Sequence, residues 1–165
     1  MGKLIDGRIS SRCNGQKPTP YLRKIMPLIC CKYRPLNSYA IDLGCGNLRN
    51  SIYVHNQFKF EVTPYDMAGD YGNKLVLGRD RINEATNSVN LILCNYLLMF
   101  LTDDERVQTA NEITRVAKRG CFLIVELYEA KTGLPYDEEK ILGLFNDRGW
   151  ECLHKEKNRF TVKKS

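Results

Sequence analysis

Short apolar runs rich in Val, Ile and Leu alternate with longer stretches of helical period from residue 39 to the end of the chain. Continuous apolar runs of this length are typical of parallel strands that are covered on both faces, and the longer stretches suit the helices that cover them. No internal repeat or low-complexity tract interrupts the alternation. The pattern therefore predicts an α/β fold with a mostly parallel sheet.

The positions of the elements follow from the same pattern. We expect strands at 39–45, 60–65, 74–77, 89–95 and 121–127, and a hairpin of strands 150–155 and 159–163 around a turn at 156–158,. Helices are expected near 48–57, 103–118 and 137–148, and an earlier helix over 21–31 is expected to be interrupted at Pro27,. Thr102 can cap the helix at 103–118, and Lys118, Arg119 and Gly120 mark its expected end,. The sequence thus predicts a Rossmann-like, seven-stranded, mostly parallel sheet with a C-terminal antiparallel hairpin and helices on both faces.

The chain's positive charge is concentrated at its beginning. Residues 1–35 hold eight Lys and Arg but one acidic residue, Asp6, whereas the whole chain of 165 residues has a net charge of +6. A basic segment can neutralise phosphates and steer a nucleic acid, although a charged run can equally be a solvated face. We expect a basic N-terminal segment with a short helix over 1–35 and one domain over 36–165, and nucleic acid is a possible partner of residues 1–35.

Cysteine usage and hydropathy indicate the compartment. The seven cysteines are odd in number, show no CxxC spacing and lie mostly among apolar residues, and only His55 and His154 could add nitrogen ligands,. No run of about twenty apolar residues occurs, and the first residues lack the features of a secretory signal,. We therefore expect a soluble, cytoplasmic protein with no metal site and no membrane partner.

A glycine-containing turn follows the first expected strand. Asp42 and Leu43 end the strand, and Gly44, Cys45 and Gly46 come next. Glycines at this point let backbone approach a ligand beyond the carboxyl ends of the strands. Asp66 lies 24 residues after Asp42, at the end of the next expected strand, where a carboxylate can accept hydrogen bonds from ribose hydroxyls,.

The details of the turn favour one kind of nucleotide. A dinucleotide-binding turn needs a third glycine where this chain has Arg49, and Asp42 would repel a pyrophosphate,. The same carboxylate can meet the ammonium of a methionine moiety. The charge pattern therefore favours a zwitterionic amino-acid ligand, such as the methionine part of S-adenosyl-L-methionine, over a diphosphate.

The stretch Asp42-Leu-Gly-Cys-Gly46 resembles motif I of the class I S-adenosylmethionine-dependent methyltransferases. Within that superfamily, 42–53, 60–66 and 98–107 are most similar to the tellurite-resistance methyltransferase family, and the similarity covers roughly residues 39–128. The resemblance implies a class I methyltransferase domain. One departure is Leu48, which stands where many such motifs have a third glycine.

The resemblance also implies roles for individual residues. Asp42, Gly44 and Gly46, with Cys45 and Asn47 of the same turn, would line the methionine end of the cofactor, while Asp66 would bind ribose. Met67 would pack on adenine, Asp80 and Arg81 would lie by the adenine amino group, and Asn95 and Tyr96 would lie beside the methionine and the transferred methyl. Met67 can equally be a packing residue, and Asp80 a solvated acid of a loop.

The methyl acceptor is not evident from the sequence. Methyl transfer from a sulfonium is an in-line displacement, so positioning matters more than an acid–base pair. Tyr96 and Tyr21 are the candidate catalytic residues, with Tyr128 and Glu126 nearby, and each tyrosine can equally be structural,.

Three functions remain open at this point. The small body and the family resemblance favour a small-molecule methyltransferase. An RNA-, tRNA- or nucleotide-directed enzyme would use the basic segment, in which Tyr21 and Tyr33 lie among the basic residues,. A cofactor-binding protein without transferase activity is the third possibility, for which Leu48 is the one indication.

Overall fold

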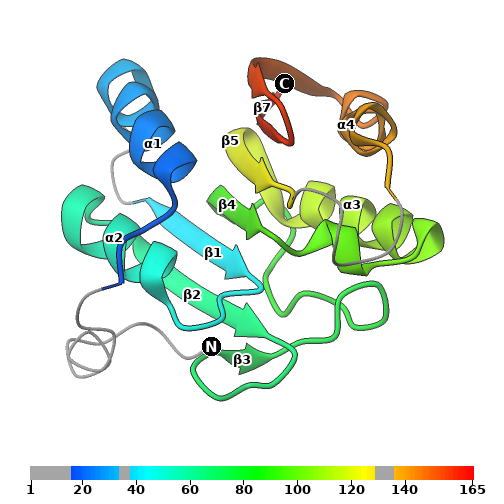
Figure 1. Ribbon diagram of the computed structural model, residues 1–165, viewed down its shortest axis with the longest axis horizontal. Helices are drawn as coiled ribbons and strands as arrows, with labels where there is room; N and C mark the ends of the chain where they lie inside the picture. Colours follow the sequence, from blue (N-terminus) through cyan, green and yellow to red (C-terminus); the bar gives the residue numbers. More distant parts are fainter. Residues whose placement is uncertain (1–15, 34–37, 129–135) are drawn as a thin grey trace.

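The computed structural model describes residues 16–33, 38–128 and 136–165, and these residues form a single seven-stranded sheet with helices on both faces (Figure 1). The strand order is β3-β2-β1-β4-β5-β7-β6. Strands β1 to β5 pair in parallel, whereas β7 is antiparallel to β5 and to β6. The strands are β1 (Tyr39–Leu43), β2 (Glu61–Asp66), β3 (Asn73–Lys74), β4 (Val89–Asn95), β5 (Ala117–Glu126), β6 (Trp150–Glu156) and β7 (Arg159–Lys164).

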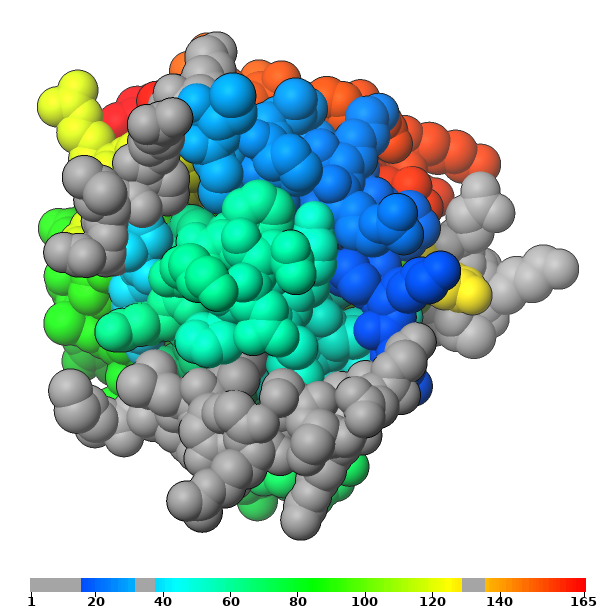
Figure 2. Space-filling model, turned by 90° about the vertical axis from the view of Figure 1, so that its left-hand side faces the viewer, coloured from blue at the N-terminus to red at the C-terminus, as the bar shows by residue number. Residues whose placement is uncertain are grey.

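Two layers of helices enclose the sheet. Helices α1 (Pro20–Tyr33) and α2 (Arg49–Phe58) lie on one face, and Figure 2 shows them side by side. Helices α3 (Asp103–Val116) and α4 (Glu138–Asn146) lie on the other face, and a short 3-10 helix, η2 (Leu98–Phe100), precedes α3.

The two layers have separate apolar cores because successive residues of a strand point to opposite faces. On β4, Leu91 and Leu93 pack under α1 and α2, while Ile92 and Cys94 pack under α3 and α4. This alternation also decides where the last residue of each strand points. It brings the polar ends of neighbouring strands to one face, as described below.

The predicted fold class is confirmed: the sheet has seven strands, is mostly parallel and ends in an antiparallel C-terminal hairpin. Three local predictions differ from the structure. The expected strand 74–77 is reduced to the two residues of β3, after which Leu75 to Leu77 line a cavity. The expected helix 103–118 ends at Val116, because Ala117 already pairs with Val89 of β4.

The third difference concerns Pro27, which does not interrupt α1. A proline inside a helix leaves the carbonyl four residues earlier without its N–H partner. In α1 that residue is Arg23, and both Arg23 and Pro27 are exposed, so water can reach the carbonyl. Buried Ile25, Met26 and Ile29 hold the helix to the sheet on either side of the proline.

Within the described residues, no helix combines the length and the apolar character needed to cross a membrane.

Candidate functional site

Three buried polar residues lie at the carboxyl ends of neighbouring strands. They are Asp42 on β1, Asn95 on β4 and Glu126 on β5, with exposed fractions of 2%, 7% and 0%. Asn95 and Glu126 are paired in the register of the sheet, and each of the three continues the row of side chains that faces α1 and α2. Buried polar side chains need hydrogen-bond partners, so this edge of the sheet is a candidate ligand-binding site.

The turn after β1 brings backbone N–H groups to the same edge. Gly44 and Gly46 have φ angles of 73° and 50°, a region that glycine enters without strain,. The N–H groups of Gly44 and Cys45 both donate to the Tyr65 carbonyl at 2.9 Å, and the Gly46 N–H donates to Asp66 Oδ2 at 2.9 Å. The turn therefore ties the end of β1 to the end of β2.

Leu48 takes the left-handed conformation that glycine would take more easily. It precedes α2 with a φ of 69°, a conformation that costs a non-glycine residue roughly 1–2 kcal/mol,. Its side chain is completely buried and does not line either of the two cavities described next. The turn thus keeps the shape of a glycine turn, and Leu48 does not narrow the site.

Two cavities open at the carboxyl edge and share Gly44 and Tyr96. The polar cavity, of about 390 Å³, is bordered by the turn after β1 and by the end of β4. The apolar cavity, of about 470 Å³, is bordered by the end of β2, the loop after β3 and the residues around η2. The polar cavity is lined by Asp42, Gly44, Cys45, Gly46, Asn47, Arg49, Asn50, Asn95 and Tyr96. The apolar cavity is lined by Gly44, Tyr65, Asp66, Met67, Leu75, Val76, Leu77, Arg79, Tyr96, Leu97, Phe100, Leu101 and Glu105. Both volumes lie in the range of small-molecule sites.

Asp42 is held inside the wall of the polar cavity. Ser51 Oγ of α2 donates a hydrogen bond to Asp42 Oδ2. Burial raises the pKa of Asp42 to about 7, and the nearby charge of Asp66 adds to the shift, while the Ser51 hydrogen bond and Arg49 oppose it. A cation bound in this cavity would favour the ionised carboxylate.

Glu126 organises the other side of the polar cavity. Asn95 Nδ2 donates to Glu126 Oε1 at 2.6 Å, and Thr19 Oγ1, just before α1, donates to the same oxygen. The Tyr96 hydroxyl donates to Glu126 Oε2 at 3.2 Å. Because the amide nitrogen of Asn95 is committed to Glu126, its Oδ1 is an acceptor, and this buried atom has no partner among the residues that the structure describes.

Tyr96 stands where the two cavities meet and carries backbone strain. Its φ is 57°, and its N–H donates to the Glu126 carbonyl at 2.7 Å. Its ring makes an edge-to-face contact with the ring of Tyr128, with centroids 5.8 Å apart. Burial and Glu126 raise the pKa of the Tyr96 phenol, while Arg159 and Arg49 lower it. Residues whose strained backbone is held in place by surrounding contacts are concentrated at functional sites.

Asp66 keeps free acceptor capacity. Its two carboxylate oxygens accept one backbone hydrogen bond each, from Gly46 and from Ala68, at 2.9 and 3.1 Å. A carboxylate offers about four acceptor positions, so about two remain for hydroxyl groups. Asp66 and its exposed neighbour Met67 both border the apolar cavity.

The structure brings most of the predicted site residues together but not all of them. Asp80 and Arg81 do not line either cavity; they border a smaller adjoining cavity of about 180 Å³ between the loop after β3 and α3. There the Val76 N–H donates to the Asp80 carboxylate at 2.8 Å and closes a turn. Arg79, which was not predicted, borders the apolar cavity instead.

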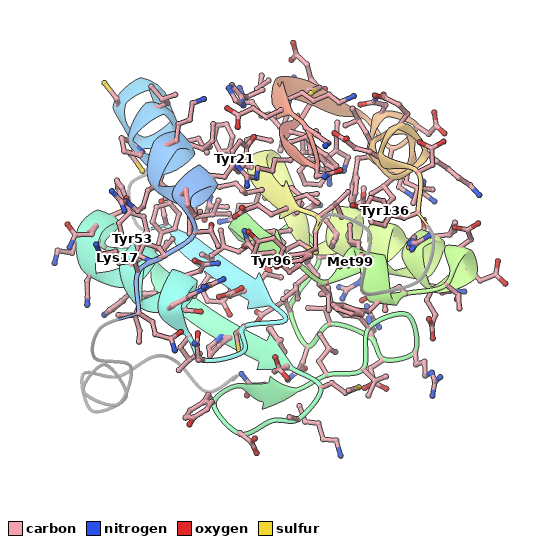
Figure 3. The ribbon with its side chains drawn as sticks, viewed as in Figure 1. Lys17, Tyr21, Tyr53, Tyr96, Met99 and Tyr136 are labelled. Atoms are coloured by element: carbon pink, nitrogen blue, oxygen red, sulfur yellow. The ribbon has the colours of Figure 1, made fainter. Side chains whose placement is uncertain are left out.

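Tyr21 also lies away from the two cavities. It is buried under α1, where its hydroxyl lies 3.0 Å from Thr161 Oγ1 and 3.2 Å from His154 Nδ1 (Figure 3). The structure therefore does not place Tyr21 among the residues that line the two cavities. Packing of α1 on β7 explains the difference, because it uses the tyrosine as a buried anchor between helix and hairpin.

Several lining residues were missed by the sequence analysis. The apolar run Leu97 to Leu101 after β4 gives three of them, Leu97, Phe100 and Leu101. The signal was present, since an apolar run directly after a buried strand lies at the edge where ligands bind. Arg49 was noted only as an obstacle to a dinucleotide, yet it lines the polar cavity.

Comparison with solved structures identifies the fold. A TehB-like S-adenosylmethionine-dependent methyltransferase from Corynebacterium glutamicum matches with a TM-score of 0.69 and 17% identity, over 96% of this chain and 92% of the other. A Burkholderia thailandensis 1,6-didemethyltoxoflavin-N1-methyltransferase, solved with 1,6-didemethyltoxoflavin and S-adenosylhomocysteine, matches with a TM-score of 0.67 and 13% identity, over 88% and 79%. A methyltransferase from Methanosarcina mazei matches with a TM-score of 0.63 and 13% identity, over 90% and 99%.

The chain has the fold of the class I S-adenosylmethionine-dependent methyltransferases. No protein-family model and no curated protein matches the sequence at a significant level. Among the described residues, no group of three or more His, Cys, Asp and Glu could hold a metal ion.

Proposed function

We propose that this protein is an S-adenosylmethionine-dependent methyltransferase acting on a small molecule. The observation that carries the proposal is the pairing of two buried acceptors, Asp42 and Asn95 Oδ1, beside the glycine turn, with Asp66 one strand away. Two buried acceptors in one cavity favour a cationic ligand group with several N–H donors. The ammonium of a methionine moiety is such a group.

The rest of the lining suits the other parts of the same cofactor. The free acceptor positions of Asp66 suit the two hydroxyls of a ribose,. Met67 and Phe100 are 69% and 54% exposed and both border the apolar cavity, so a purine ring could cover them. Exposed large apolar side chains at a cavity are typical of ligand contacts.

The protein's own residues would bind and orient the reactants. When bound, the cofactor supplies an electrophilic methyl group on a sulfonium. Tyr96 borders both cavities and is fixed by Glu126, so its phenol would position an acceptor where the polar and apolar parts of the site meet. Positioning of this kind is the main contribution that an enzyme makes to an in-line displacement.

The cofactor part of the proposal is tested by calorimetric titration with S-adenosylmethionine and S-adenosylhomocysteine. We expect binding of both, and loss of at least about tenfold in affinity in Asp66→Ala, because hydroxyls would lose a charged acceptor. Asp70→Ala is the matched control, because Asp70 is an exposed carboxylate four residues away that lines neither cavity. Absence of binding, or equal binding of NADH, would contradict the proposal.

The substrate part is tested by offering labelled S-adenosylmethionine with separated cell-extract fractions. Label is expected in the fraction of small metabolites. Label in RNA, together with salt-dependent retention on RNA that is lost on deletion of residues 1–17, would instead favour the RNA-directed alternative. Cofactor binding without transfer to any fraction would favour a non-catalytic binding protein.

A further inference from the structure

Two arginines lie near Tyr96. Arg49 is the first residue of α2 and lines the polar cavity together with Tyr96. Arg159 begins β7, and its Nε lies 3.8 Å from Glu126 Oε2, the atom that accepts the Tyr96 hydroxyl at 3.2 Å. Two guanidinium groups from distant parts of the chain therefore reach the same end of the site.

Neither guanidinium is committed to a hydrogen bond within the described residues. Arg159 has two acidic neighbours, Glu126 at 3.8 Å and Glu156 at 4.0 Å, and both distances exceed hydrogen-bond length,. For Arg49, the described part of the chain offers no ion pair or side-chain hydrogen bond. Each guanidinium carries five N–H donors in a planar fork. The donors of Arg49 line the polar cavity and are available to a ligand there, and those of Arg159 lie near the Tyr96 hydroxyl through Glu126.

Arg159 forms an ion pair with the buried Glu126 carboxylate, but at 3.8 Å this pair leaves the N–H groups of Arg159 without a hydrogen bond to it,. The oxygens of Glu126 are occupied by Thr19, Asn95 and Tyr96, and the carboxylate is fully buried. The side chain of Arg159 is 36% exposed, so part of it is accessible to a ligand. Burial and Glu126 raise the pKa of the Tyr96 phenol, and both arginines act in the opposite direction, as positive charges near the phenol do,.

An aromatic wall completes this end of the site. Tyr128, after β5, is 55% exposed and contacts the Tyr96 ring edge to face. Its backbone is held at two points: its N–H lies 3.2 Å from Met99 Sδ, and its carbonyl accepts the Tyr136 hydroxyl. Figure 3 shows Tyr96, Met99 and Tyr136 along one edge of the sheet. An exposed ring whose backbone is anchored in this way is a preformed surface for a planar ligand.

We propose that Arg49, Arg159, Tyr96 and Tyr128 form a subsite for the carboxylate of a small aromatic acid, which is the substrate class of the enzyme. The planar fork of arginine matches a carboxylate with two parallel hydrogen bonds, and the two tyrosine rings match a planar body. This inference rests on the proposed function, because it assigns the acceptor end of the same site.

One rival assignment has to be separated by experiment. Arg49 lines the polar cavity with Asp42, so it could pair with the cofactor's own carboxylate. In that case Arg49→Gln would weaken S-adenosylhomocysteine binding and have no separate effect on an aromatic acid. Arg159 does not line the polar cavity, which makes it the cleaner probe of the subsite.

The test is calorimetric titration of the full chain, saturated with S-adenosylhomocysteine, with benzoate, salicylate and 4-hydroxybenzoate. Benzamide serves as the uncharged control, acetate as the control without a ring, and selenite as an inorganic oxyanion. We expect at least one aromatic acid to bind about tenfold or more tightly than both benzamide and acetate. In Arg159→Gln and Arg49→Gln we expect that binding to weaken by about tenfold or more, with Arg49→Lys intermediate.

Arg119→Gln is the matched control for loss of one positive charge, since Arg119 is exposed on β5 and lies outside the subsite. Far-ultraviolet circular dichroism of each variant reports whether the protein is folded, because Arg49→Gln can change S-adenosylhomocysteine binding directly. The inference is overturned if no aromatic acid exceeds benzamide, if acetate or selenite binds as tightly, or if Arg159→Gln behaves like Arg119→Gln. Failure of S-adenosylhomocysteine to bind the unchanged protein would instead overturn the proposed function.

Discussion

The ionisation of one buried carboxylate, Asp42, should make ligand binding at the site depend on pH. Burial raises its pKa to about 7 in the ligand-free protein, and the proposed ammonium partner needs the ionised form,. Affinity for S-adenosylhomocysteine should therefore fall below pH 7, by up to about tenfold per pH unit. Calorimetric titrations between pH 5.5 and 7.5 measure this slope. In Asp42→Asn, which cannot ionise, we expect weak binding with no such slope.

Asp42 should affect the stability of the protein in the opposite direction, with a contribution that decreases as the pH rises. In the folded protein Asp42 holds its proton up to about pH 7, whereas in the unfolded chain it loses the proton near pH 4,. The folded state binds more protons in that window, so the contribution of Asp42 to stability falls as the pH rises from about 4 to 7. Asp42→Asn should consequently gain melting temperature relative to the unchanged protein at pH 7.5 but not at pH 4.5. An equal difference at both pH values would show that the carboxylate is not buried as described.

At the scale of elements, the start of α3 is fixed by a reciprocal pair of hydrogen bonds. The Glu105 N–H donates to Thr102 Oγ1 at 3.3 Å, and the Thr102 N–H donates to the Glu105 carboxylate at 2.9 Å. Thr102→Ala removes one half of the pair and should lower the free energy of unfolding by about 1 kcal/mol in urea titration. Gln108→Ala, an exposed change in the same helix, should stay within about 0.5 kcal/mol,. Equal effects would rule out capping as the cause.

The close approach of the loop after β3 to α3 gives a second prediction at this scale. Gly78 has a φ of 80°, and a Cβ added there would lie 2.5 Å from Glu105 Cβ. Gly120 has the same φ of 80° but open space around it. Gly120→Ala thus measures backbone strain alone, about 1–2 kcal/mol, whereas Gly78→Ala adds a collision that pushes the loop away.

Leu77 and Arg79 of that loop line the apolar cavity, so displacement of the loop should also affect ligand binding. Chemical denaturation should show a larger loss of stability for Gly78→Ala than for Gly120→Ala. Titration should show weaker S-adenosylhomocysteine binding for Gly78→Ala alone. If the two alanine variants lose equal stability and bind equally well, the loop does not depend on its contact with Glu105.

The sequence predicted those elements whose local pattern and tertiary surroundings agree. The strand β4 was predicted to the residue because Val89 to Asn95 is a mostly apolar run between turns, buried throughout except at the half-buried Asn90. The predicted interruption at Pro27 was wrong because it depends on the surroundings of the Arg23 carbonyl, which loses its N–H partner. Only the docking of α1 decides whether that carbonyl faces water or protein. The same holds for Tyr21, whose partners Thr161 and His154 lie more than 130 residues away in the chain.

The site residues, too, were predictable where a local sequence signal marks them. The turn at Gly44 and the carboxylate of Asp66 are local signals at strand ends and did reach one edge of the sheet. Arg159 could not be foreseen, because only the pairing of β7 with β5 brings it to Glu126. Asp80 lies outside the two cavities because a local turn, closed by the Val76 N–H, holds it beside the adjoining smaller cavity.

At the scale of the whole molecule, the packing of α1 decides whether the basic N-terminal part belongs to the folding unit or is an appendage to a domain over 36–165. Met26 of α1 is fully buried on one face of the sheet, while Trp150, the only tryptophan, is buried on the other.

Met26→Ala should lower the free energy of unfolding by about 2–5 kcal/mol. In a cooperative unit, Trp150 fluorescence and far-ultraviolet circular dichroism would shift to the same lower urea midpoint. Leu28→Ala, on the exposed side of the helix, should leave both midpoints nearly unchanged. A Trp150 transition that stays in place in Met26→Ala would mean that α1 unfolds separately from the sheet, and the Thr19 contact with Glu126 would then be lost before the rest of the site,.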